Sequence, residues 1–428
     1  KGVEKQGPGT LRLGGNSTGL VGAFTVIAEG TIEFTNANAF GTSRVQLGVV
    51  GGRPVRRVEC ERELAEPGRE DAETVLTASQ AAVAGGFTSI SAMPNTNPVA
   101  DTAGVVEQIF ALGRTHGLCD VNPIGAVTIG QRGETLAEMS AMNQSVANVR
   151  IFSDDGHCVA DPLVMRRALE YVRIFDGVIA QHAQDPNLTV DAQMNEGVVS
   201  SRLGLKGWPA VAEESIIARD VLLADHVHSR LHICHVSTAG SVEIIRWAKE
   251  RGINVTAEVT PHHLLLTDEL AESFDPIYKV NPPLRSQRDV EALREGLADG
   301  TIDIIATDHA PHPREAKECE WSAAAFGMLG LETAFSIAYL AMVRSKMINL
   351  STLISRMSTI PASIARFADQ GSLDVGNFAN FALVDLEKSW KVDLERIRSK
   401  SRNTPFLEIE LPGSISSTFY RGREVFHG

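Results

Sequence analysis

The stretch LHICHVSTAGSVEIIRWAKERGINVTAEVTPHH, residues 231–263, contains the structural unit that recurs along this chain. An apolar run, Leu231–Val236, comes first, and apolar residues then follow at a spacing near 3.6 over Ser241–Gly252. A second apolar run, Val255–Thr260, closes the unit. Short apolar runs rich in β-branched residues predict buried strands, and the spacing near 3.6 predicts a helix. Strand, helix and strand in this order indicate two parallel strands that are joined by a helical crossover.

The same unit recurs on both sides of this stretch. Further strands are predicted at Phe87–Met93, Val121–Val127, Val149–Asp154, Val178–His182 and Ile302–Thr307. Further helices are predicted over Asp161–Val172, Glu213–Ala224 and Ser286–Ala298. Near-continuous apolar strands that alternate with helices are typical of a parallel sheet that is covered on both faces. A closed barrel needs eight strands, so we expect the missing first strand at Val58–Glu63, although that stretch is mostly charged.

We therefore expect an α/β fold, a (β/α)8 TIM barrel over residues 56–365. The two chain ends have a different pattern, because residues 1–55 are rich in Gly, Thr and Asn and residues 366–428 carry few helix signals. Together they predict one small β domain beside the barrel. Candidate strands of this domain are Ala23–Ala28, Thr31–Thr35, Phe378–Leu386 and Ser414–Phe426.

Composition narrows the class of protein. Of the 428 residues, 40 are Lys or Arg and 53 are Asp or Glu, which gives a net charge of −13. An acidic surface disfavours nucleic acid and anionic membranes as partners, because binding phosphate requires clustered cations.

We see neither an apolar run of membrane-spanning length nor an export signal in residues 1–10. The five cysteines are scattered and never in C-x-x-C spacing, which favours a reducing compartment. We expect a cytoplasmic protein.

Polar residues follow the ends of the predicted strands. The carboxyl ends of barrel strands meet at one rim, where catalytic groups lie. Two imidazoles, from His182 and His235, and the carboxylate of Asp155 form a suitable shell for zinc with an open position for water. Zinc lowers the pKa of such a water to near neutrality. Asp155 is also placed to bridge two metals, and Asp308 either to ligate a metal or to transfer a proton.

Simpler interpretations apply to several other residues. A single histidine at a strand end is usually a hydrogen-bonded core residue, but several candidate ligands at one rim favour a metal site. His232 is interpreted as a structural residue of the barrel wall. His226 and His228 imitate a ligand pair, yet they follow a predicted helix, so we expect them on the surface. Asp154 is interpreted as a hydrogen-bonding neighbour of Asp155.

Long motifs from about Glu66 to the C-terminus, some five sixths of the chain, resemble bacterial dihydroorotases of the amidohydrolase superfamily. The motifs are EPGRE (66–70), GGFT (85–88), MPNTNP (93–98), FSDDG (152–156), TPHHL (260–264), VNPPLR (280–285), ATDHAPH (306–312) and NTPF (403–406). The resemblance implies the zinc-dependent, reversible cyclisation of N-carbamoyl-L-aspartate to L-dihydroorotate in pyrimidine synthesis.

The resemblance also implies roles for individual residues. Asp155 would bridge two zinc ions, His182 and His235 would hold one of them, and Asp308 would bind the other and act as general acid and base. The implied substrate-binding residues are Asn95, Asn281, His312, Phe326 and Gly327. Hydantoinases and allantoinases are similar as well, but they carry a carboxylated lysine where Asp155 stands. The aspartate therefore resembles the Asp-bridged dihydroorotases.

The chain departs from the family pattern just before Glu66. The family motif His-x-His-Leu-Arg is replaced by Glu61-Arg62-Glu63-Leu64-Ala65, so two metal ligands and a substrate-binding arginine are missing. Three explanations fit. Residues 1 to about 65 do not represent a native reading; or the barrel has lost turnover and is a structural partner of aspartate transcarbamoylase; or the enzyme works with one zinc. In the last case Glu61 and Glu63, two apart on a strand, offer oxygen ligands from one face. The expected assembly is a homo-oligomer or a complex with that transcarbamoylase.

Overall fold

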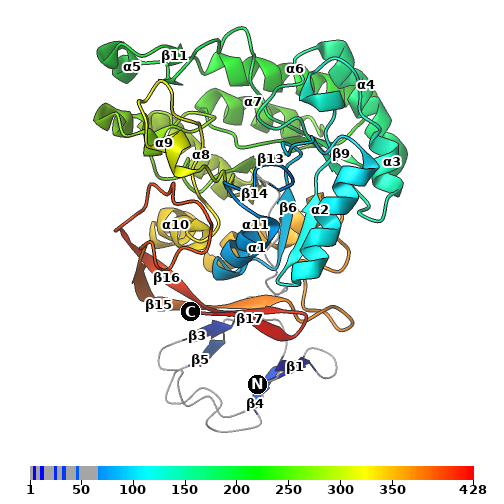
Figure 1. Ribbon diagram of the computed structural model, residues 1–428, viewed down its shortest axis with the longest axis vertical. Helices are drawn as coiled ribbons and strands as arrows, with labels where there is room; N and C mark the ends of the chain where they lie inside the picture. The colour runs from blue at the N-terminus through cyan, green and yellow to red at the C-terminus, as the bar shows by residue number, and fades with distance from the viewer. Residues whose placement is uncertain (1–2, 6–9, 14–23, 27–30, 35–44, 48–65) are drawn as a thin grey trace.

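The computed structural model describes residues 66–428 and, upstream of them, five short strands (Figure 1). These are β1 (Val3–Lys5), β2 (Thr10–Leu13), β3 (Phe24–Val26), β4 (Thr31–Phe34) and β5 (Val45–Leu47). The predicted first barrel strand, Val58–Glu63, lies outside the described residues, and so do Glu61, Glu63 and Ala65.

Parallel strands follow one another in chain order through the described part of the barrel. They are β6 (Ser89–Ala92), β7 (Asp120–Pro123), β8 (Ile151–Phe152), β9 (Val178–Gln181), β12 (Leu231–Ile233), β13 (Val255–Val259) and β14 (Ile304–Ile305). Strands β8 to β14 of this series form one five-stranded sheet, β6 pairs with β7, and a parallel bridge between Gly125 and Phe152 joins the two groups. The seven strands predicted from the apolar runs are thereby confirmed, in the predicted order.

The strands are shorter than predicted, and one of them shows why. The run Val149–Asp154 is a strand only over β8, and at its end the carboxylate of Asp154 accepts hydrogen bonds from the N–H groups of Val127 (2.8 Å) and Thr128 (3.0 Å). Main-chain pairing thus ends at Ser153, whose N–H donates to the carbonyl of Gly125 (2.9 Å), and the side chain of Asp154 makes the next contacts. Asp154 is therefore the hydrogen-bonding neighbour that the sequence predicts, and Asp155 is turned into the rim.

Helices surround the strands (Figure 1). They are α1 (Val75–Ala84), α2 (Ala103–His116), α3 (Met139–Gln144), α4 (Pro162–Val172), α5 (Val198–Leu203), α6 (Val211–Val227), α7 (Ala239–Glu250), α8 (Gln287–Asp299), α9 (Arg314–Lys317), α10 (Ala334–Ala338), α11 (Leu350–Met357) and α12 (Thr359–Ile364). Short helical turns, η1 to η5, cover Ile129–Gln131, Arg173–Phe175, Asp268–Ser273, Pro276–Tyr278 and Tyr339–Arg344, and β10 (Met194–Asn195) pairs with β11 (Gly207–Trp208). Side chains cap several of these helices, as Asp161 does for α4 and Thr238 for α7, which explains where they begin. No helix in the described ranges is long and apolar enough to cross a membrane.

A second sheet joins the two ends of the chain (Figure 1). Its order is β17-β16-β15-β3-β5, in which β15 (Phe381–Lys391), β16 (Glu410–Tyr420) and β17 (Arg423–His427) are antiparallel. Strand β3 pairs with β15 through Thr25 and Val384, so a sheet formed by both ends is confirmed. Thr418 donates a hydrogen bond to the carbonyl of Val83 (2.6 Å), which ties this sheet to α1. The domain boundaries at 55/56 and 365/366 stay predictions.

Candidate active site

Three of the predicted metal ligands meet at the carboxyl ends of the barrel strands. Asp155 follows β8 by three residues, His182 follows β9 directly and His235 follows β12 by two residues. Nδ1 of His182 lies 2.8 Å from Nε2 of His235, and these nitrogens lie 3.6 and 3.7 Å from Oδ1 of Asp155. All three residues are at most 6% exposed. The barrel thus assembles a buried cluster from three separate strand–helix units.

The cluster has the charge and the donor atoms that suit a metal. Burial raises the pKa of Asp155, but the contacts with His182 and His235 outweigh it and hold that pKa well below its ordinary value. The carboxylate is therefore ionised at neutral pH. Two imidazole nitrogens and one carboxylate oxygen form a donor set that catalytic zinc sites use, so the residues fit a zinc ion.

Gln184, which the sequence analysis did not single out, fixes the orientation of one ligand. Nε2 of His182 lies 2.8 Å from Oε1 of Gln184, and Nδ2 of Asn281 donates to the same oxygen at 3.1 Å. An amide oxygen only accepts, so Nε2 of His182 carries a proton, which leaves Nδ1 as the nitrogen on the side of Asp155 and His235. The sequence offers one weak signal for this role, a polar amide two residues beyond a ligand histidine.

Glu258 on β13 is a second residue that the sequence analysis missed. Its side chain is fully buried, lies 3.0 Å from Nε2 of His232 and accepts a long hydrogen bond from the N–H of His235 (3.4 Å). Nδ1 of His232 lies 2.8 Å from the hydroxyl of Thr256, and burial lowers the pKa of His232 to about 4. His232 is thus a neutral structural residue, as predicted. The exposed positions of His226 and His228 confirm the prediction for that pair as well.

Asp308 and Asn95 reach the rim in different ways. Nδ2 of Asn95 donates to Oδ2 of Asp155 at 3.3 Å, so this predicted substrate residue lies beside the ligand cluster. Asp308 does not belong to the three-residue cluster among the described residues. Its backbone has φ +43°, and that of His235 has φ +31°. Positive φ angles are costly for residues with a Cβ and concentrate at functional sites, where the surrounding structure holds them.

The remaining predicted substrate residues come together in the segment that follows β14. Nε2 of His312 lies 2.6 Å from the carbonyl oxygen of Phe326. Gly327 has φ +133°, and a Cβ at this position would lie 2.7 Å from Nε2 of His312. Burial lowers the pKa of His312 to about 4, so its ring is neutral at pH 7. His312, Phe326 and Gly327 therefore form one packed unit.

A cavity of about 470 Å³ borders His312. Acidic and basic side chains both line it, and the basic ones are Arg314, Lys317, Lys400 and Arg402. Lys317 is 5% exposed, and its ammonium group donates to the carbonyl oxygens of Lys279 and Ala325, both at 3.0 Å. Burial lowers the pKa of Lys317 to about 7, with the charge of Lys279 adding to the effect. The lining of the cavity therefore has mixed charge, and Arg314 is paired with Glu318 (2.5 Å).

This protein is a barrel of parallel strands that carries a buried aspartate and two histidines at the carboxyl ends of its strands, which defines a TIM barrel with a candidate metal site. The solved L-hydantoinase (dihydropyrimidinase) from Arthrobacter aurescens has the same fold, with a TM-score of 0.81 and 24% identity, and the match covers 95% of each chain. This likeness confirms the predicted TIM barrel.

The model of the dihydro-orotase-like family matches residues 56–241. A protein from Streptomyces coelicolor named dihydroorotase is 62% identical over 367 residues, 86% of each chain. Another, from Leifsonia xyli subsp. xyli, is 56% identical over 415 residues, 97% of this chain and 94% of the relative, so that match extends upstream of Glu66. The chain belongs to the dihydroorotase family, as its motifs indicate.

Proposed function

We propose that this protein is a dihydroorotase that catalyses the reversible cyclisation of N-carbamoyl-L-aspartate to L-dihydroorotate in cytoplasmic pyrimidine synthesis. The observation that carries the proposal is the buried cluster of Asp155, His182 and His235 in a chain of this family.

In this proposal, metal binding and proton transfer are assigned to named residues of the site. We propose that His182, His235 and Asp155 hold one zinc ion, and that Asp155 and Asp308 are the ligands for a second. Zinc would supply Lewis acidity toward the reacting carbonyl group and the attacking water. Asp308 takes the proton from water during ring opening and gives it to the leaving nitrogen, and it reverses these transfers during cyclisation.

Five residues are the substrate-binding residues of this proposal: Asn95, Asn281, His312, Phe326 and Gly327. Asn95 and Asn281 already contact the cluster, through Asp155 and Gln184 respectively. His312, Phe326 and Gly327 would bind the part of the substrate that faces away from the zinc. Holding the amide and the carboxylate of the substrate in reacting geometry is their contribution to rate.

The replaced motif at Glu61, Glu63 and Ala65 favours a second candidate function, a non-catalytic subunit that assembles with aspartate transcarbamoylase. Loss of a bidentate arginine contact to the substrate alone would cost about 1.5–3 kcal/mol of binding. Two missing imidazoles would also leave one metal position without its strongest ligands.

Hydrolysis of L-dihydroorotate by the purified protein, with and without added zinc, tests the catalytic proposal. Zinc-dependent turnover that Asp308→Asn abolishes is the expected result, and hydantoin as an alternative substrate identifies hydantoinase-like ring opening. Absence of turnover on either substrate, together with co-purification of a transcarbamoylase, would favour the second candidate. The triple variant Glu61→His, Glu63→His and Ala65→Arg then asks whether restoring the family motif restores turnover.

A further inference from the structure

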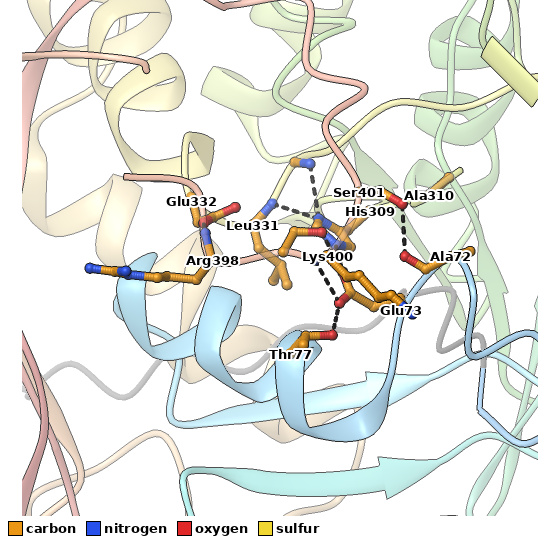
Figure 2. A network of polar contacts seen from close by, with 12 residues as sticks. Ala72, Glu73, Thr77, His309, Ala310, Leu331, Glu332, Arg398, Lys400 and Ser401 are labelled. Atoms are coloured by element: carbon orange, nitrogen blue, oxygen red, sulfur yellow. Dashed lines mark hydrogen bonds and ion pairs between the residues drawn. The ribbon is translucent and has the colours of Figure 1, made fainter. Parts of the chain in front are cut away.

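The carboxylate of Glu73 lies fully buried just before α1, where three separate parts of the chain meet (Figure 2). It accepts hydrogen bonds from the hydroxyls of Thr77 and Ser399 and from the N–H of Lys400 (3.1 Å). Its Oε2 also lies 3.5 Å from Nε2 of His309, which follows Asp308 directly. A buried charge with this many partners is fixed in place, because losing any partner would leave charge unsatisfied.

His309 is held from its other side by the main chain. Its ring is fully buried, and Nδ1 accepts hydrogen bonds from the N–H groups of Gly330 and Leu331, both at 3.2 Å (Figure 2). A nitrogen that accepts carries no proton, so the proton of the neutral ring sits on Nε2, the nitrogen that lies 3.5 Å from Oε2 of Glu73. The ring therefore has one orientation and one tautomer.

His309 directly follows Asp308 in the chain, and the backbone of Asp308 is in the left-handed region at φ +43°. The following residue is held too, because the N–H of Ala310 donates to the carbonyl of Met328 (3.0 Å) and its carbonyl accepts from Nδ2 of Asn403 (2.8 Å). A backbone conformation that an aspartate seldom adopts persists only where its surroundings impose it.

We propose that Glu73 and His309 form a positioning pair that holds Asp308 in its reactive orientation. The inference rests on the proposed function, because it assigns Asp308 the proton transfer. The pair touches neither zinc nor substrate in this scheme. It acts through the backbone, and it also couples α1 and the segment around Ser399 to the catalytic rim.

The first test is hydrogen exchange on Glu73→Gln, which keeps the shape of the side chain and removes its charge. We expect faster exchange at Ala310, Gly330 and Leu331, whose N–H groups depend on this arrangement. Asp303→Asn is the matched control, because Asp303 is a hydrogen-bonded carboxylate that directly precedes β14, whereas Asp308 follows the other end of that strand. Asp303 binds Lys249 (2.6 Å) and the N–H of Ala257 (2.8 Å). Unchanged exchange in Glu73→Gln, or equal changes in both variants, would overturn the inference whether or not the wild-type protein turns over dihydroorotate.

The second test uses turnover and separates positioning from stability. In Glu73→Gln and in His309→Asn we expect kcat to fall about tenfold or more, with KM within about twofold and zinc content unchanged, because a displaced proton-transfer group slows the chemical step. The double variant should lose no more than the worse single variant, as coupled residues do. If the wild-type protein is active and kcat of the variants equals it, or falls only as far as in Asp303→Asn, the pair has no positioning role. An inactive wild-type protein would instead refute the proposed function, while the exchange experiment still decides whether the pair holds the Asp308 segment.

Discussion

Nδ1 of His182 and Nε2 of His235 lie 2.8 Å apart, and both face the carboxylate of Asp155. Two imidazoles that approach so closely from different strands present their ring nitrogens to one point. The three groups converge on one point, as the ligands of a single metal ion do, so this cluster is the first feature to test.

His182→Ala should reduce bound zinc to less than a tenth of the wild-type content, because one of three buried ligands is removed. Metal analysis of the purified variant after equilibration with zinc measures this. His226→Ala is the matched control, because His226 is exposed at the end of α6 and should leave the zinc content unchanged. Equal zinc content in all three proteins would show that the cluster is not the metal site.

Gln184→Leu should weaken zinc binding about 10- to 100-fold, because the hydrogen bond that fixes the tautomer of His182 is lost. A competition titration with a chelator gives the affinity. Gln144→Leu removes an amide whose hydrogen bond, to Ser140, is exposed, and it should have no effect. If Gln184→Leu binds zinc as tightly as the wild-type protein, the amide does not orient the ligand.

Gly327→Ala should lower kcat/KM about 100-fold, because the new methyl group would displace His312 or Ala310 and disturb substrate positioning. Steady-state kinetics on L-dihydroorotate measure the change. Gly376→Ala is the control for backbone strain, since Gly376 has φ +101° but no neighbouring atom within 4 Å of the position that the new methyl group would take. Similar losses of activity in both variants would assign the effect to strain and not to contact with His312.

Glu332→Gln should make the stability of the protein less dependent on pH. Burial raises the pKa of Glu332 to about 7, the hydrogen bond from the N–H of Arg398 opposes this, and the charge of Glu73 adds to it. Because the folded pKa lies above the ordinary value of 4.5, the stabilising contribution is complete below pH 4.5 and is lost as the pH rises through about 7. The wild-type protein should therefore lose about 1–3 kcal/mol more than the variant between pH 4.5 and 8.

Urea unfolding of both proteins at the two pH values measures that difference in the free energy of unfolding. Glu250→Gln removes an exposed carboxylate from α7 and controls for the loss of one negative charge. A parallel pH dependence in the wild-type protein and Glu332→Gln would contradict the prediction.

The sequence was sufficient to place the metal ligands because their positions follow from strand periodicity. Asp155, His182 and His235 each come within three residues of a strand end, and parallel strands bring such positions to one rim whatever the intervening helices contain. The exact strand ends did not follow in this way, because side chains such as that of Asp154 compete with main-chain pairing.

By itself, the sequence determined the order of strands and helices, the sheet shared by the chain ends and the family to which the protein belongs. These features depend on local periodicity and on motifs that are continuous in the chain. Only the tertiary structure decided which polar residues support the site. Glu73 accepts a hydrogen bond from Ser399, which is 326 residues away in the sequence. Glu258 on β13 contacts His232 on the neighbouring strand β12. Such partners are far apart in the sequence and come together only when the chain folds. A buried charge is stable only where the folded chain supplies hydrogen bonds to it.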